Sequence, residues 1–174
     1  MTNNPLRRYI DSKAEPGSSW ALVTGSTGGI GLEWARQLAH LGFSILLHGR
    51  NGEKLQKVRS EIEASLPENM REKVVIKPVI ADAASVTSNG LGEISTHLSA
   101  ASDLNLKVVV NNLGVVHDTY PVLENVQEGE IMSMIASNIS FSTLVAAKAL
   151  PLLKKNQPSL MINTSSLAAY APGP

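Results

Sequence analysis

The chain has 174 residues, the size of one domain, and 43% of them are hydrophobic against 17% charged, a balance that supports a packed core and excludes general disorder. Fifteen basic side chains match fifteen acidic ones, so no excess positive charge is available to bind nucleic acid. The sequence contains no cysteine, which excludes disulfides, thiolate metal ligands and a cysteine nucleophile.

Residues 1–19 are polar and show no sustained periodicity, so we expect a loose leader followed by one domain over residues 20–174. The leader lacks the apolar core of a signal peptide, and this favours a cytoplasmic location. No apolar run reaches the roughly 20 residues that a membrane-spanning helix needs, because Lys148 and Pro151 interrupt the stretch 144–153. The sequence therefore predicts no membrane span.

From Trp20 onward, short apolar runs alternate with amphipathic stretches of helical periodicity. The predicted strands are 20–23, 44–47, 73–80, 106–110 and 160–162, and the predicted helices are 30–41, 54–66, 85–98 and 128–153. Strand and helix alternate throughout, and each right-handed crossover between parallel strands lays its helix against the sheet. The pattern predicts an α/β fold with a five-stranded parallel sheet and helices on both faces.

A glycine-rich segment, Thr-Gly-Ser-Thr-Gly-Gly-Ile-Gly at residues 24–31, follows the first predicted strand and opens the first predicted helix. Glycine permits a positive φ and lets the backbone approach a pyrophosphate, which free N–H groups at the helix N-terminus then bind. No Lys follows the glycines as a P-loop requires, so the alternative to a dinucleotide site is a plain turn. The residues predicted to bind the dinucleotide here are Gly25, Ser26, Thr27, Gly29, Ile30 and Gly31.

Four motifs, in this order, resemble those of the classical short-chain dehydrogenases/reductases. Thr-Gly-x-x-x-Gly-Ile-Gly at 24–31 is the first, and Asn-Asn-Leu-Gly at 111–114 follows the fourth strand. Asn138 matches the family's structural and catalytic asparagine, and Ser166, after the fifth strand, matches its catalytic serine. Within the family, the chain is most similar to the branch of microsomal 17-beta-hydroxysteroid dehydrogenases and very-long-chain 3-oxoacyl-CoA reductases.

This resemblance implies an α/β fold of the Rossmann type, a doubly wound parallel sheet truncated after its fifth strand. It implies a nicotinamide dinucleotide, held in part by Asn112 and Gly114, and hydride transfer to or from a keto or hydroxy group of a lipid-like substrate such as a 3-oxoacyl-CoA or a steroid. It is also compatible with a homodimer packed through the helix in 131–153 and with association with the endoplasmic reticulum.

The end of the second strand indicates which nicotinamide cofactor is preferred. An acidic residue there would bind the ribose 2′-hydroxyl, but the chain continues with Arg50 and has no carboxylate before Glu53. A guanidinium fits a 2′-phosphate, so we expect NADP(H) in preference to NAD(H); the alternative is that Arg50 ends the strand in solvent. Asp82, after the third strand, matches the family's adenine contact, or it caps the helix that follows.

The family's proton donor is a tyrosine with a lysine four residues later, after the catalytic serine. Beyond Ser166 the only tyrosine is Tyr170, and Pro174 stands four residues on. The one Tyr-x-x-x-Lys in the sequence, Tyr9 with Lys13, precedes the first strand and is read as chance. We therefore expect this chain to be inactive alone, and three hypotheses stay open: an NADP-dependent oxidoreductase, a catalytically silent nucleotide-binding module, and an unstable fragment.

Overall fold

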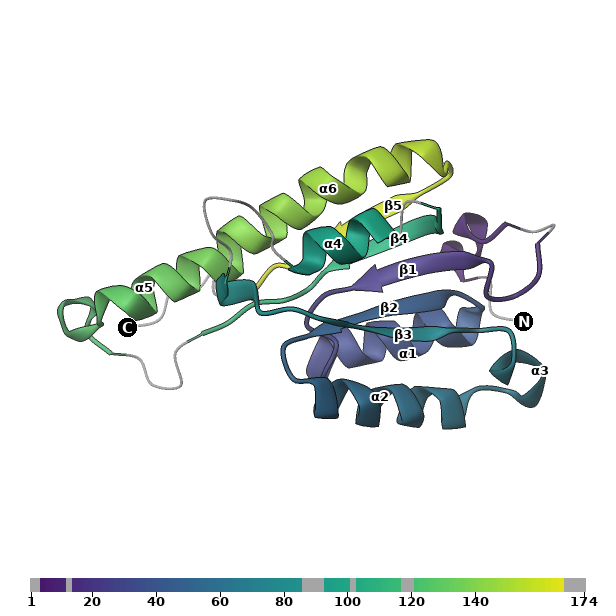
Figure 1. Ribbon diagram of the computed structural model, residues 1–174, viewed down its shortest axis with the longest axis horizontal. Helices are drawn as coiled ribbons and strands as arrows, with labels where there is room; N and C mark the ends of the chain where they lie inside the picture. The colour runs from purple at the N-terminus through teal and green to yellow at the C-terminus, as the bar shows by residue number, and fades with distance from the viewer. Residues whose placement is uncertain (1–3, 12–13, 86–92, 101–102, 117–120, 168–174) are drawn as a thin grey trace.

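Five parallel strands form one sheet at the centre of the computed structural model, which describes residues 4–11, 14–85, 93–100, 103–116 and 121–167 (Figure 1). They are β1 (Ser19–Val23), β2 (Ser44–Gly49), β3 (Ile76–Ile80), β4 (Asn105–Asn111) and β5 (Leu160–Asn163). The spatial order is β3-β2-β1-β4-β5, so the chain moves outward from β1 in one direction and then in the other. The predicted doubly wound parallel sheet is confirmed, and its direction of winding reverses between β1 and β4.

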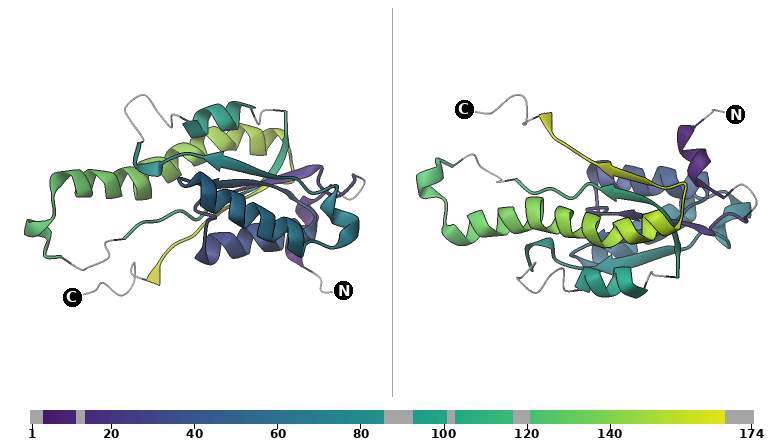
Figure 2. Two further views of the ribbon diagram at one scale, coloured as in Figure 1. Left: turned by 60° about the horizontal axis from the view of Figure 1, so that its bottom comes forward. Right: turned by 90° about the horizontal axis from the view of Figure 1, so that it is seen from above.

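Helices cover both faces of this sheet, and Figure 2 shows the two layers from further directions. On one face lie α1 (Gly29–Leu41) and α2 (Gly52–Ser65), followed by the short α3 (Glu68–Arg71). On the other lie α4 (Glu93–Ala100) and a long helix made of α5 (Glu128–Ile135), the π-helix η4 (Ala136–Phe141) and α6 (Ser142–Lys155). Three short 3₁₀ turns complete the described elements: η1 (Pro5–Tyr9), η2 (Ala83–Ser85) and η3 (Leu123–Asn125).

The core divides into two clusters because neighbouring strand residues point to opposite faces. Ala21 and Val23 of β1 pack toward α1 and α2, in the cluster that contains the fully buried Phe43. Leu22 packs the other way, toward α4 and α6, with the fully buried Phe141. The central strands are thus mostly apolar on both faces, and Lys107 of β4 and His48 of β2 are the polar or charged exceptions within their apolar runs.

The segment before β1, which the sequence favoured as a loose leader, makes defined contacts where it is described. Asn4 caps η1 by accepting a hydrogen bond from the Leu6 N–H at 2.9 Å. Tyr9 is buried in the cluster shared by α1 and α2, and the Arg8 guanidinium lies over its ring. Leu6 and Ile10 also pack against this cluster, so three side chains connect the segment to the core.

The structure differs from the predicted helix 85–98 at the N-terminal end of that helix. Ala83–Ser85 form the 3₁₀ turn η2, and the α-helix described after it is α4, Glu93–Ala100. Residues 86–92 of the prediction lie outside the described residues. The Asp82 carboxylate accepts a hydrogen bond from the Ala84 N–H at 3.0 Å, so the expected capping role is realised on η2.

The helix Glu128–Lys155 agrees with the predicted helix 128–153, and within it η4 joins α5 and α6 without a break. It has 28 residues, a window of mean hydropathy 1.3, and 17% of that window buried. The absence of a membrane span stays a prediction, because this helix is long and apolar enough to cross a membrane by length and composition alone. Val145, Ala149 and Leu153 nevertheless pack against the sheet, as in any helix that covers a Rossmann core, and α5 projects beyond the strands (Figure 2).

Candidate functional site

A cleft of about 480 Å³ opens at the carboxyl ends of the strands, where β1 and β4 diverge. In open α/β sheets, ligands bind at this reversal of strand order, because adjacent loops turn away from each other there. The cleft is lined by Gly25, Thr27, Gly28, Ile30, Gly49, Arg50, Ala81, Asp82, Ala83, Asn112, Leu113, Gly114, Val115 and Ser137.

The glycine-rich turn forms one wall of this cleft and needs glycine for two separate reasons. Gly25 and Gly29 have φ values of 66° and 53°, in the left-handed region that side chains disfavour. Gly31 is buried, and a Cβ there would press on the Gly25 carbonyl oxygen and lie 2.6 Å from Asn112 Nδ2. The first two positions set the path of the turn, and the third allows α1 to approach it.

The N-terminus of α1 faces the turn without a side-chain cap. Gly28, the residue before the helix, offers no capping group, and the first helical turn contains no acidic residue. Its N–H groups therefore keep their capacity to donate, and the positive end of the helix dipole is not neutralised by a carboxylate. An added Cβ at Gly28 or Gly29 would meet nothing within 4 Å, so there is room for an anion beside this end.

The loop after β4 is tied to the loop after β1 by reciprocal hydrogen bonds. Thr24 Oγ1 accepts from the backbone N–H groups of Asn112 and Leu113, at 3.0 and 3.1 Å. Asn112 Nδ2 donates to the Thr24 carbonyl at 3.2 Å and to the Gly25 carbonyl at 3.4 Å. These bonds hold the two walls of the cleft at a fixed separation.

Seven of the ten residues predicted to bind the dinucleotide line the cleft: Gly25, Thr27, Ile30, Arg50, Asp82, Asn112 and Gly114. The other three support the turn from different positions. Ser26 is fully buried, and its hydroxyl donates to the His48 carbonyl at 2.9 Å, which directs it away from the cleft. Gly31 lies beneath the turn, and Gly29 borders a different hollow between α1 and α2.

The two predicted catalytic residues occupy different surroundings. The Asn138 side chain, in η4, accepts from the Val115 N–H at 2.8 Å and donates to the Val115 carbonyl at 2.9 Å. It thereby fixes the backbone of a residue that lines the cleft. Ser166 is exposed just beyond the end of β5 and is not among the residues lining the cleft.

Sequence reasoning missed two groups near the cleft. Ser137 lines it while being 3% exposed, and its place one residue before Asn138 was the available signal. His48 was not among the predicted site residues, and it lies fully buried under the glycine turn, where its Nδ1 accepts from the Gly25 N–H at 3.3 Å. No spacing rule points to it, because its role depends on the contact between β2 and the turn.

Burial gives His48 unusual acid–base behaviour. Loss of solvent lowers its pKa from 6.5 to about 4, and the nearby His97 acts in the same direction. The hydrogen bond from the ring to the Ala81 carbonyl raises the pKa of His48, and so does the negative charge of Asp82. These two effects are smaller than the effect of burial. The ring is therefore neutral at physiological pH.

The sheet order, together with the glycine turn and the uncapped helix end at the reversal point, is typical of dinucleotide-binding α/β proteins. The model of the family described as short chain dehydrogenase matches residues 19–174, and the chain belongs to this family. The resemblance drawn from the four sequence motifs is thereby confirmed.

Two curated relatives within this family are similar to the chain in sequence. A very-long-chain 3-oxoacyl-CoA reductase of Coprinopsis cinerea is 33% identical over 177 residues, covering 100% of this chain and 48% of the relative. A very-long-chain 3-oxoacyl-CoA reductase of Caenorhabditis elegans is 30% identical over 161 residues, covering 91% of this chain and 48% of the relative. The chain thus spans about half the length of the curated relatives it matches.

Solved structures share the fold at lower identity. A 7beta-hydroxysteroid dehydrogenase superposes with a TM-score of 0.75 at 20% identity, over 91% of this chain and 58% of that chain. A short-chain dehydrogenase from Sphingobium yanoikuyae in complex with NADPH gives a TM-score of 0.72 at 22% identity, over 88% and 55%. These likenesses establish the architecture of the sheet and its helices.

The acid–base behaviour of His48 predicts a pH dependence of stability. The unfolded chain takes up a proton near the ordinary pKa of 6.5, whereas the folded chain does so only near 4, so the free energy of unfolding should fall as the pH drops from about 6.5 to about 4. The contribution is at most about 3 kcal/mol. Urea unfolding between pH 7.5 and 4 should show this slope in the wild type and a smaller one in His48→Gln. Equal slopes would contradict the assignment.

The surroundings of three glycines predict how much each alanine substitution lowers the free energy of unfolding. Gly31→Ala should destabilise the fold by about 1–3 kcal/mol, because its Cβ has no room against the turn. Gly29→Ala should cost only about 1–2 kcal/mol, since it has open space and suffers from the positive φ alone. Gly129→Ala, also in open space and without a positive φ, serves as the control. Thermal unfolding of the three variants should rank them in this order.

Proposed function

We propose that the cleft binds a nicotinamide dinucleotide, with NADP(H) preferred over NAD(H), in an oxidoreductase that acts on a keto or hydroxy group of a lipid-like substrate. Residues 1–174 lack the Tyr-x-x-x-Lys proton donor expected after Ser166. One observation carries the proposal: the glycine turn and the uncapped N-terminus of α1 border a cleft at the reversal of strand order. Membership in the short chain dehydrogenase family supports the reaction class.

The shape of the turn fits a pyrophosphate. Open space beside Gly28 and Gly29 adjoins the N–H groups of the first turn of α1, which donate to an anion without competition from a carboxylate. A side chain at Gly31 would push the helix away from the turn and misplace these donors. The residues present therefore suit a diphosphate at this position.

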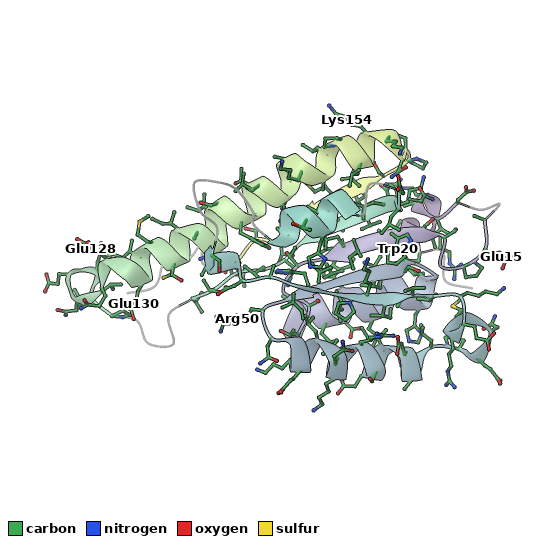
Figure 3. The ribbon with its side chains drawn as sticks, in the orientation of Figure 1. Glu15, Trp20, Arg50, Glu128, Glu130 and Lys154 are labelled. Carbon is green, nitrogen blue, oxygen red and sulfur yellow. The ribbon has the colours of Figure 1, made fainter. Side chains whose placement is uncertain are left out.

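Arg50 supports the preference for NADP(H). It directly follows β2, lines the cleft and is exposed, so its guanidinium is accessible to a phosphate (Figure 3). A planar guanidinium donates two parallel hydrogen bonds to a phosphate, which a ribose hydroxyl does not reproduce. Asp82, which follows the neighbouring strand β3 and also lines the cleft, has one carboxylate oxygen engaged by the Ala84 N–H and leaves a polar edge for adenine.

When bound in the cleft, a nicotinamide dinucleotide would supply the chemistry of hydride transfer, and residues of the chain would position the substrate oxygen. Asn138 fixes Val115 on both its N–H and its carbonyl, which holds this wall of the cleft in place. The Ser166 hydroxyl is assigned by the family resemblance to donate to the substrate oxygen. The names of the two reductases similar to this chain support a long acyl substrate.

A nucleotide-binding module without hydride transfer is the second candidate. It is supported by the position of Ser166, which is exposed and outside the residues that line the cleft. One measurement distinguishes the two candidate functions. Both require NADPH to bind, whereas only the oxidoreductase makes NADPH oxidation depend on added 3-oxoacyl-CoA or ketosteroid.

We also propose a homodimer through the long helix. Met132, Ile135 and Ile139 lie on one side at helical spacing and are 63%, 41% and 60% exposed. Two antiparallel copies whose stripes face each other would bury these three side chains between them.

Removal of the Arg50 guanidinium should lower the affinity for NADPH and not the affinity for NADH. Arg50→Ala is expected to weaken NADPH binding by about 1.5–3 kcal/mol, the range for a hydrogen bond to a charged group, and to leave NADH binding unchanged. Fluorescence titration with both cofactors measures this difference. Arg59→Ala, which removes an arginine paired with Glu63 on α2, is the matched control. Equal losses for NADPH and NADH would refute the assignment of Arg50.

Charges on the apolar stripe should disrupt the dimer. The double variant Met132→Glu and Ile135→Glu is expected to run as a monomer, because it would bury four carboxylates in the shared surface. Leu123→Glu places a charge at a residue that is 74% exposed outside this helix and should leave the dimer intact. Light scattering after gel filtration measures the mass. A wild type with the mass of one chain, 18.5 kDa, would overturn the proposal.

A further inference from the structure

His48 contacts three separate parts of the molecule from the interior of β2. Its Nδ1 lies 3.3 Å from the backbone nitrogen of Gly25 in the glycine turn. Its Nε2 lies 3.2 Å from the carbonyl oxygen of Ala81, in the segment after β3. Its ring stacks on Phe141 of η4, with centroids 5.0 Å apart and planes inclined by 28°. The side chain is fully buried, and Gly25 and Ala81 are the hydrogen-bond partners of its two ring nitrogens.

The partners determine which nitrogen carries the proton. A backbone N–H only donates, so Nδ1 must present its lone pair to Gly25. A backbone carbonyl only accepts, so Nε2 must carry the hydrogen that Ala81 receives. A single neutral tautomer satisfies both neighbours. The other tautomer would set two N–H groups against each other at Gly25 and two lone pairs against each other at Ala81.

His48 also forms hydrogen bonds with Ser26, the residue of the turn that follows Gly25. The His48 carbonyl accepts from the backbone N–H of Ser26 and from its hydroxyl, both at 2.9 Å. Gly25 and Ser26 are the residues where the chain leaves β1, since the N–H of Thr24 still donates to Val110 in the neighbouring strand β4. Three hydrogen bonds therefore connect the first two residues of the turn to one residue of β2.

We propose that His48 is a positioning residue for the cofactor site, in which the Nδ1 lone pair holds the Gly25 N–H and thereby sets the path of the glycine turn. This inference rests on the proposed function for its consequence in binding. Gly25 and Ala81, the two hydrogen-bond partners of the ring, both line the cleft. A shift of the ring would therefore move two walls of the site together.

Two amide variants separate the roles of the ring nitrogens. In His48→Asn the amide oxygen occupies the place of Nδ1 and still accepts from Gly25. In His48→Gln the longer side chain brings its amide nitrogen to the place of Nε2, where it donates to Ala81 and leaves Gly25 without an acceptor. The two variants carry the same functional group in a buried position, so each serves as the control for the other.

NADPH titration of the intact chain should distinguish the variants. His48→Gln is expected to weaken binding at least about tenfold, the effect of leaving a buried donor unpaired, whereas His48→Asn stays within about threefold of the wild type. Equal binding by both variants, strong or weak, would show that the ring acts by packing alone and would overturn the inference.

Two measurements without cofactor keep the inference separate from the proposed function. Amide hydrogen exchange at Gly25 should be faster in His48→Gln than in His48→Asn, and equal rates would overturn the inference even if NADPH binds. In the wild type, ¹⁵N spectra of the imidazole should show the Nε2–H tautomer, and the Nδ1–H tautomer would overturn it even if neither variant folds. A wild type that binds no dinucleotide would instead refute the proposed function, while both measurements still decide the role of His48.

Discussion

The hydrogen bonds between Thr24 and the loop after β4 are the constraint on which the cleft depends. β1 and β4 are adjacent, but the chain leaves them toward opposite faces of the sheet, and the gap between the two exits is the cleft. Without a tie, each exit loop would be free to move with its own helix. Thr24 Oγ1 accepts from two backbone groups of the opposite loop, and Asn112 returns two bonds through its amide. These four hydrogen bonds hold the two loops at a fixed distance from each other at the bottom of the cleft.

Much of the fold was predictable because its signals are local in the sequence. Apolar runs on strands such as 106–110 are buried on both faces, and amphipathic periodicity marks the helices that cover them. The glycine turn was predictable for a related reason: glycine at 25, 29 and 31 is required by backbone geometry or contact distance, and no other residue type would give the same pattern. Family membership follows from the same short segments.

The remaining features depend on contacts between segments distant in the chain. The sequence placed Ser26 with the cofactor residues, but its hydroxyl is bonded to a carbonyl of β2. His48 looked like an interruption of an apolar strand, and its contact with Gly25 exists only because β2 lies beside β1. Tyr9 likewise becomes a core residue only when the folded sheet offers it a surface. Patterns of spacing contain none of this information.

The π-helix η4 also sets the rotational phase of the long helix. Successive residues of an α-helix are separated by about 100° around its axis, and a π-helical turn accommodates one residue more than an α-helical turn. If Ala136–Phe141 kept its six residues but formed regular α-helical turns, α5 would be rotated by about 100° relative to α6. The side of α5 that carries Met132 and Ile135 would then point elsewhere, while Val145 and Ala149 kept their places on the sheet. The wider turn of η4 therefore determines which surface the projecting half of the helix presents.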